Sequence, residues 1–219
     1  MPIISLISSK GGCGKTTVAV LLATELARYG SVCLIDTDPR QRTTKWHSRK
    51  PIENPAIQIC LEARDFTKVL KSANQDYAFV VVDTEGRESN INSVTIGRSD
   101  LVIIPTRDRQ QDCEDTLDVI SEIQGIADSY DKTLQYRVLF NAVKPVARTK
   151  LQVTLRSMVS DENPTFNTAI TDRGPYDAIF NQGGGLKDLD TKEFSNTHEA
   201  TEEIFRLVEE ILNVLGEKQ

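Results

Sequence analysis

The fold of this chain is decided by the segment Ser8-Ser9-Lys10-Gly11-Gly12-Cys13-Gly14-Lys15-Thr16-Thr17. An apolar run, residues 3–7, precedes the segment, and a helix-compatible run, residues 18–29, follows it. A strand, a glycine-rich loop and a helix in this order are typical of a phosphate-binding loop, because glycines let successive N–H groups point at phosphate oxygens. Lys15 is expected to reach the β- and γ-phosphates, and the Thr16 hydroxyl to bind Mg²⁺. A glycine-rich turn with incidental lysines is the weaker alternative.

The loop departs from the general pattern GxxxxGK[ST], since Ser9 stands where a glycine is expected and a second lysine, Lys10, opens the loop. In this form, residues 10–17 closely resemble the deviant Walker A motif of the ParA/MinD family of ATPases. The resemblance implies that Lys10 reaches across a dimer interface to the partner's nucleotide, and that Lys10 and Lys15 take part in catalysis. It also implies that ATP is bound by Lys10, Gly11, Gly12, Cys13, Gly14, Lys15, Thr16 and Thr17.

Composition narrows the class of protein. A length of 219 residues predicts a single domain, residues 1–219. No apolar run approaches the roughly 18–20 residues of a membrane span, and the N-terminus lacks the basic stretch of a signal peptide, so we expect a cytoplasmic protein.

Four irregularly spaced cysteines argue against a zinc site or a disulfide framework. A net charge of −6 gives no global sign of nucleic-acid binding, which would therefore need a local basic patch.

Two carboxylates follow the apolar run 32–35, in the order Asp36-Thr37-Asp38-Pro39-Arg40. Carboxylates at the end of a strand beside a phosphate loop lie where Mg²⁺ and the attacking water are expected, although ordinary turn chemistry accounts for the same pattern equally well. The segment resembles the DxDPQ switch I motif of the ParA/MinD family. By that resemblance Asp36 supports Mg²⁺ and Asp38 orients the hydrolytic water, while Arg40 replaces the usual glutamine.

A third carboxylate, Asp83, ends the continuous apolar run 77–82 and is followed by Thr84-Glu85-Gly86. A hydrophobic strand that ends in aspartate is the Walker B arrangement, which holds Mg²⁺ through water. Gly86 would let the following loop move when a γ-phosphate arrives. The expected metal site therefore consists of Thr16, Asp36 and Asp83.

Two later segments are candidates for the base of the nucleotide. Asn141 follows the apolar run 136–140 and offers the donor and the acceptor that a base edge requires, although it also suits an Asx turn. The segment 166–173 resembles the I-T-x-R element of small plasmid partition ATPases. That resemblance implies that the backbone of Thr171, Asp172 and Arg173 frames the base.

Two basic stretches are candidates for contact with DNA. Residues 40–50 contain five cations and no acid, and they surround Trp46; the alternative is a solvated helix with Trp46 in the core. A second patch consists of Arg148, Lys150 and Arg156, on a predicted helix before residue 166. The sequence favours neither patch over the other.

Two helices have regular patterns. The spacing of apolar residues predicts a helix over 112–127, whose acidic residues we interpret as solvated surface. A second helix, over 196–215, has an apolar stripe at i, i+3, i+4 spacing. Its other face carries Glu202, Glu203, Glu209 and Glu210. Because a membrane-surface helix is usually basic, we expect the last helix to pack on the domain.

Seven strand candidates alternate with helices along the chain. This pattern predicts an α/β fold, a doubly wound and mostly parallel sheet with helices on both faces, of the P-loop NTPase type. The nucleotide is then expected at the carboxyl ends of the strands.

The resemblance covers nearly the whole chain and is closest to the short ParA-type plasmid partition ATPases, because the phosphate loop starts at residue 10 with no helix-turn-helix domain before it. It implies a weak, partner-stimulated ATPase with ATP and Mg²⁺ as cofactors. It also implies a homodimer on ATP binding, non-specific DNA binding in the nucleoid, and a small DNA-binding centromere protein as partner. The alternatives are a ParA-like ATPase for another cargo, such as a conjugation complex, and a MinD-like membrane-site ATPase.

Overall fold

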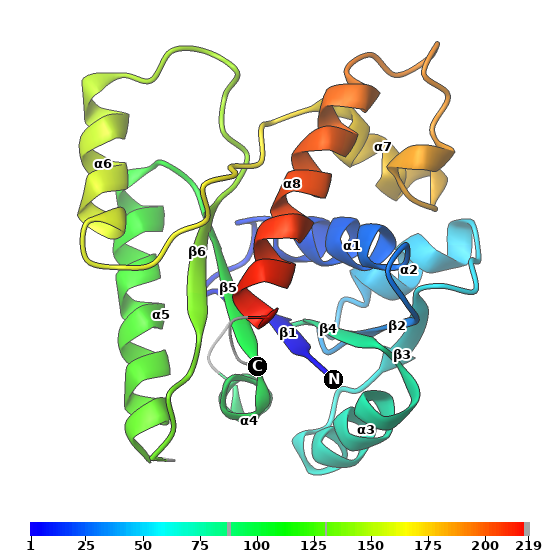
Figure 1. Ribbon diagram of the computed structural model, residues 1–219, viewed down its shortest axis with the longest axis vertical. Coiled ribbons are helices and arrows are strands. Elements are labelled where there is room, and N and C mark those ends of the chain that lie inside the picture. Colours follow the sequence, from blue (N-terminus) through cyan, green and yellow to red (C-terminus); the bar gives the residue numbers. More distant parts are fainter. Residues whose placement is uncertain (87–88, 130, 217–219) are drawn as a thin grey trace.

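The computed structural model describes residues 1–86, 89–129 and 131–216, and in these ranges six parallel strands form one sheet (Figure 1). Their order across the sheet is β3-β2-β4-β1-β5-β6. The strands are β1 (Ile3–Leu6), β2 (Val32–Asp36), β3 (Ala56–Ile59), β4 (Phe79–Asp83), β5 (Leu101–Thr106) and β6 (Tyr136–Phe140). The predicted doubly wound α/β fold is therefore confirmed.

The helices connect these strands and follow them. They are α1 (Lys15–Leu26), α2 (Arg42–Arg49), α3 (Ala63–Asp76), α4 (Asn90–Arg98), α5 (Gln110–Ser129), α6 (Lys150–Ser160), α7 (Gly174–Gln182), the 3₁₀ turn η1 (Leu186–Asp188) and α8 (Thr197–Gly216). The two helices predicted over 112–127 and 196–215 are α5 and α8, with ends shifted by one or two residues.

Both faces of the sheet are buried at its centre, which explains why β4 and β5 are almost continuously apolar. In β4, Val81 packs with α1 and α8 on one face, whereas Val80 and Val82 pack with α3 on the opposite face. Successive side chains of a strand point to opposite faces, so an uninterrupted Val80-Val81-Val82 run supplies both layers at once.

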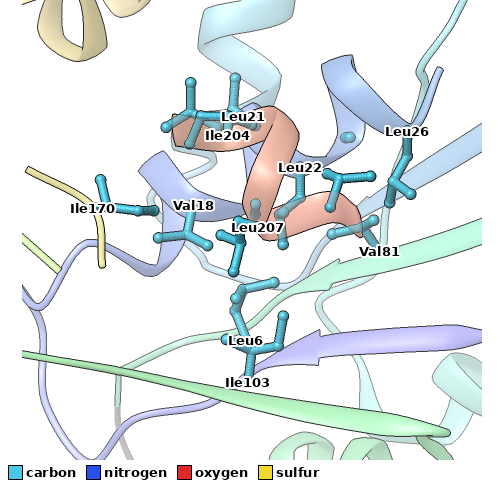
Figure 2. Packing of buried hydrophobic residues seen from close by; sticks show 14 of the residues in the cluster. Leu6, Val18, Leu21, Leu22, Leu26, Val81, Ile103, Ile170, Ile204 and Leu207 are labelled. Carbon is cyan, nitrogen blue, oxygen red and sulfur yellow. The ribbon is translucent and has the colours of Figure 1, made fainter. Parts of the chain in front are cut away.

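The layer over the first face is built on α1 and α8. Val18 and Leu22 of α1 pack in one cluster with Leu6 of β1 and with Leu207 of α8 (Figure 2). Since these side chains are almost completely buried, this contact fixes α1, and with it the loop from which α1 starts.

The opposite face is covered by α3, α4 and α5, and α6 packs against α5 (Figure 1). One α5 residue in that layer is Ile120, which lies with Ile104 of β5. Helices therefore cover both faces of the sheet, as a doubly wound fold requires.

The seventh predicted strand, residues 166–173, is not formed. The segment runs beside β6 and makes only isolated bridges at its ends, Val138 with Thr165 and Val143 with Thr171. On its other side, backbone N–H groups bond to two glutamates of α8 instead of to a further strand. The segment therefore takes the place of an edge strand without continuing the regular ladder.

The order of the strands places the phosphate loop beside two carboxylates. β1 lies between β4 and β5, so the chain changes direction across the sheet next to β1. In the register of the sheet, Leu6 at the end of β1 is level with Asp83, and Asp36 at the end of β2 is level with Asp83. Ligands in open α/β sheets bind at such a switch point, outside the carboxyl ends of the strands.

Candidate nucleotide-binding site

The phosphate loop joins β1 to α1 through a backbone that needs glycine. Gly12 and Gly14 have φ of +91° and +95°, a region that L side chains rarely adopt. Gly14 is the N-cap residue of α1 and provides no side-chain cap for the backbone N–H groups of the first turn. The N–H groups at the start of α1 are therefore donors suited to an anion.

Lys15 lies inside this loop with only 6% of its surface exposed. Its Nζ donates to Ser8 Oγ at 2.6 Å and to the carbonyl of Lys10 at 3.3 Å. Both acceptors are neutral oxygens, so the ammonium has no anionic hydrogen-bond partner among the described residues. A phosphate group in the loop would supply such a partner.

Two side chains from neighbouring strands support the loop from outside. Nδ2 of Asn141, at the end of β6, donates to the carbonyl of Cys13 at 2.7 Å. A Cβ at Gly14 would lie 2.0 Å from the same Nδ2, so Asn141 also requires glycine there. Arg107, after β5, donates to the carbonyl of Gly12. The structure thus gives Asn141 a role in shaping the loop, and its contact with the base stays a prediction.

Asp36 and Asp83 are adjacent and completely buried. Burial raises the pKa of Asp83 to about 7; the charge of Asp36 adds to this, while the hydroxyls of Thr43 and Thr16 and the charge of Lys15 oppose it. Burial is also the main cause that raises the pKa of Asp36. The predicted metal residues are thus brought together.

The residues of this site fit a divalent cation. Oδ1 of Asp83 is buried and accepts no well-aligned hydrogen bond from the described residues. Two buried, adjacent carboxylates with an unused oxygen are costly without a positive partner, and oxygen ligands of this kind suit Mg²⁺. In the described ranges no group of three or more His, Cys, Asp or Glu side chains forms a metal site, so most ligands here would be water or phosphate oxygens.

Asp38 faces the phosphate loop across an open cavity of about 210 Å³. Its Oδ1 accepts a hydrogen bond from the backbone N–H of Arg40 at 2.8 Å, and its own N–H donates to Asp36 Oδ1 at 3.2 Å. The turn is thereby tied to Asp36. The cavity is lined by Gly11, Gly12, Lys15, Asp38, Arg40, Arg42, Glu85 and Gly86.

Lys10 points away from this cavity and toward α5. Its Nζ contacts Asp112 Oδ1 at 2.7 Å and also pairs with Asp115. Burial lowers the pKa of Lys10, but the bonds to the two aspartates outweigh it and raise the pKa above its ordinary value. The interpretation of the α5 acids as simple solvated surface is therefore wrong for these two residues.

Thr171 and Arg173 are held by α8. Glu203 accepts from the Thr171 N–H at 2.9 Å and from its hydroxyl at 2.6 Å, and lies 3.6 Å from Arg173. Glu203 is 6% exposed, and Glu210 accepts from the N–H groups of Asn167 and Thr168. Glu203 is thus buried, and the partly exposed Glu210 also binds the segment instead of only facing solvent. Framing of the base by residues 171–173 stays a prediction.

The cations of the two basic stretches differ in their exposure. Arg156 is not available to DNA, since its guanidinium lies 4.3 Å from the ring of Phe140 and 3.7 Å from Asp108, with 12% of the side chain exposed. Arg148 and Lys150 are exposed. Trp46 is completely buried and donates to the carbonyl of Gly184, in agreement with the alternative interpretation of residues 40–50.

Within the described ranges, none of the helices combines the length and the apolar character needed to cross a membrane. This holds also for α8, whose apolar stripe is buried against α1 and the sheet.

Comparison with known proteins shows the family. The family model described as VirC1 protein matches residues 1–214. Protein ParA of Rhizobium radiobacter is 31% identical over 196 residues, which cover 88% of each chain. Maintenance of carboxysome distribution protein A of Halothiobacillus neapolitanus is 24% identical over 214 residues, 95% of each chain.

A solved structure shares the fold. The septum site-determining protein MinD of Pyrococcus horikoshii, complexed with Mg-ADP, superposes with a TM-score of 0.71 at 16% identity, covering all of this chain and 98% of MinD. The family match over residues 1–214 and the ParA likeness agree with this fold. The chain therefore belongs to the VirC1 protein family, within the ParA/MinD class of P-loop ATPases.

Proposed function

We propose that this chain is an ATP-dependent DNA partition protein. It binds ATP with Mg²⁺, dimerises in the ATP state, binds DNA without sequence preference, and hydrolyses ATP slowly until a partner stimulates it. The observation that carries the proposal is the arrangement around one cavity, where the phosphate loop with Lys15 lies next to Asp38 and next to the buried pair Asp36 and Asp83.

The chain's own residues divide the work of hydrolysis. Lys15 and the N–H groups of the loop bind and orient the phosphates. Thr16, Asp36 and Asp83 would hold Mg²⁺ through oxygen and water ligands, and the bound metal would neutralise charge on the phosphates. Asp38, on the opposite wall of the cavity, orients the attacking water and accepts its proton.

Lys10 supplies the link to dimerisation. In the single chain, Asp112 and Asp115 neutralise its ammonium. In the proposed ATP dimer, Lys10 exchanges these carboxylates for the triphosphate of the partner subunit. The triphosphate is itself an anion of high charge, so the Lys10 ammonium keeps an anionic partner in this exchange.

DNA binding would use phosphate contacts from a local cationic patch, because the chain as a whole carries a net charge of −6. Arg148 and Lys150 are exposed in the segment before and at the start of α6 and suit such contacts. We further propose a small DNA-binding centromere or adaptor protein as the partner that stimulates hydrolysis, and a nucleoid-associated position in the cytoplasm.

A second candidate keeps the ATPase and changes the cargo. One relative in the family is named for the distribution of carboxysomes, which supports transport of a large intracellular body as an alternative to DNA partition. A MinD-like role at a membrane has less support, since α8 carries acids on its polar face and buries its apolar face.

The test is binding of the purified chain to non-specific duplex DNA, with ATP, ADP or no nucleotide, across a salt series. Binding that needs ATP and weakens steeply with salt supports the partition dimer. Lys15→Ala is expected to lose both ATP-dependent DNA binding and hydrolysis. ATP-dependent dimerisation without DNA binding in any state would favour the second candidate, and full ATPase activity of Lys15→Ala would refute the site.

A further inference from the structure

Two arginines line the cavity that faces the phosphate loop. Arg40 follows the turn at Asp38, and Arg42 is the first residue of α2. Both side chains are exposed, and neither forms an ion pair with a described residue. Nη1 of Arg40 lies 3.9 Å from the position that a Cβ on Gly11 would occupy, so this guanidinium stands directly against the loop.

The other cations of the stretch 40–50 are already engaged. Lys45 Nζ donates to the carbonyl of Arg40 at 2.8 Å, and Arg49 donates to the carbonyl of Phe180. Lys50 pairs with Asp188 at 3.1 Å. The stretch is therefore not one uniform basic patch, because only its first two cations face the cavity.

The start of α2 is fixed by the same carboxylates that suit the metal. Thr43 Oγ1 donates to Asp83 at 2.7 Å, while the N–H and hydroxyl of Thr44 both donate to Asp36 at 3.0 Å. The N-cap residue, Gln41, has φ of +50° and provides no side-chain cap. Asp36 thus caps α2 from β2, so the backbone of Arg42 is placed by the metal site itself.

The cavity contains acidic as well as basic side chains, and this balance of charge indicates a role for the two arginines. Asp38 and Glu85 also line it, and they would repel a further negative group placed opposite the loop. Lys15 alone is a compact point charge directed at the loop, whereas guanidinium groups offer planar pairs of donors that match phosphate oxygens.

We propose that Arg40 and Arg42 bind the terminal phosphate of a nucleoside triphosphate whose inner phosphates occupy the loop. They make the site selective for triphosphate over diphosphate, and they do so within one subunit. This inference rests on the proposed nucleotide-binding function and adds the residues that sense the terminal phosphate. It also gives a role to the arginine that stands where the family motif has glutamine.

The experiment measures equilibrium dissociation constants for ATP and ADP, with Mg²⁺, on the full chain and on Arg40→Ala, Arg42→Ala and the double variant. Arg49→Ala is the matched control, since it removes an arginine from the same helix outside the cavity. Circular dichroism melting curves show whether each variant is folded.

We expect each single variant to lose about tenfold in ATP affinity, as for a charge-assisted phosphate contact, with ADP affinity changed less than about twofold. Arg40→Lys should recover only part of the loss, because it keeps the charge without the planar donors. The control should bind both nucleotides like the unmodified chain.

If the arginine variants lose equal affinity for ATP and ADP, or lose none, the inference is overturned. The proposed function would still stand in that case, provided that the unmodified chain binds nucleotide. Unchanged nucleotide affinities together with lost DNA binding would overturn it as well and assign the arginines to DNA. An unmodified chain that binds neither nucleotide would overturn both this inference and the proposed function.

Discussion

Glu203 is predicted to be a major source of stability, although it lies on a helix face whose sequence suggests acidic surface. Its buried carboxylate accepts from the N–H and hydroxyl of Thr171 at 2.9 and 2.6 Å and from the hydroxyl of Tyr176 at 2.6 Å. Arg173 lies 3.6 Å away. Glu203→Ala would leave the donors of Thr171 and the guanidinium without this acceptor, while the Tyr176 hydroxyl would keep only its 3.2 Å bond to the carbonyl of Ala200.

The size of the effect follows from those contacts. An unsatisfied buried donor costs about 1–3 kcal/mol, and removing one partner of a buried ion pair about 3–5 kcal/mol. Because the contacts share one carboxylate, we expect a loss of about 3–5 kcal/mol in the free energy of unfolding, not their sum. For a chain of this length that corresponds to a fall in Tm of about 6–20 °C.

The assay is urea unfolding followed by circular dichroism, on Glu203→Ala, on Tyr176→Phe and on the double variant. The double-mutant cycle should give a coupling of about 0.5–3 kcal/mol between the two side chains. Glu202→Ala is the control, since its exposed neighbour position predicts a change within about 0.5 kcal/mol. Glu203→Ala costing no more than Glu202→Ala would refute the reasoning.

The remaining predictions concern charge at the site. Burial raises the pKa of Asp83 from 3.8 to about 7, so this group destabilises the metal-free fold progressively as pH rises from 3.8 through 7. From about pH 5.5 to 8, the free energy of unfolding of the unmodified chain should therefore fall by about 2 kcal/mol relative to that of Asp83→Asn, measured by urea unfolding in EDTA. Parallel curves of unfolding free energy against pH would contradict this. Replacing both Asp112 and Asp115 by asparagine frees Lys10, and should shift ATP-driven dimerisation to lower protein concentration in sedimentation velocity; a dimer weaker than that of the unmodified chain would count against the exchange of partners.

The sequence predicts the phosphate loop and the carboxylates well, because both depend on local patterns. A glycine-rich loop that ends in Gly14-Lys15-Thr16 between a strand and a helix is typical of phosphate binding, and parallel strands that end in Asp36 and Asp83 must meet at one edge of the sheet. These residues lie together in the structure because the register of β2 and β4 makes them level.

The contacts that sequence reasoning missed are those made between distant segments. Glu203 and Glu210 are seven residues apart and border the apolar stripe of α8, but nothing local shows that residues 166–173 will run beside them. The resemblance of that segment to partition ATPases implies a seventh strand, but it does not tell whether a second ladder partner exists. The prediction of a DNA contact for Arg156 fails for the same reason, because Asp108 and Phe140 reach it from other elements.

Gly86, in the loop after β4, packs directly against the backbone of the phosphate loop at Lys10 and Gly11. A Cβ there would lie 2.6 Å from the carbonyl carbon and oxygen of Lys10, which are backbone atoms that cannot rotate away. That carbonyl oxygen also accepts from Ser8 Oγ at 2.8 Å and from Lys15 Nζ at 3.3 Å. A shift of the chain after β4 would therefore displace the peptide unit of Lys10. That unit bonds to Lys15, which is expected to bind phosphate, and it carries the side chain of Lys10, which is proposed to cross the dimer interface. Movement of one loop is thus passed to the other through a single peptide unit, and a methyl group at residue 86 would push the two loops apart.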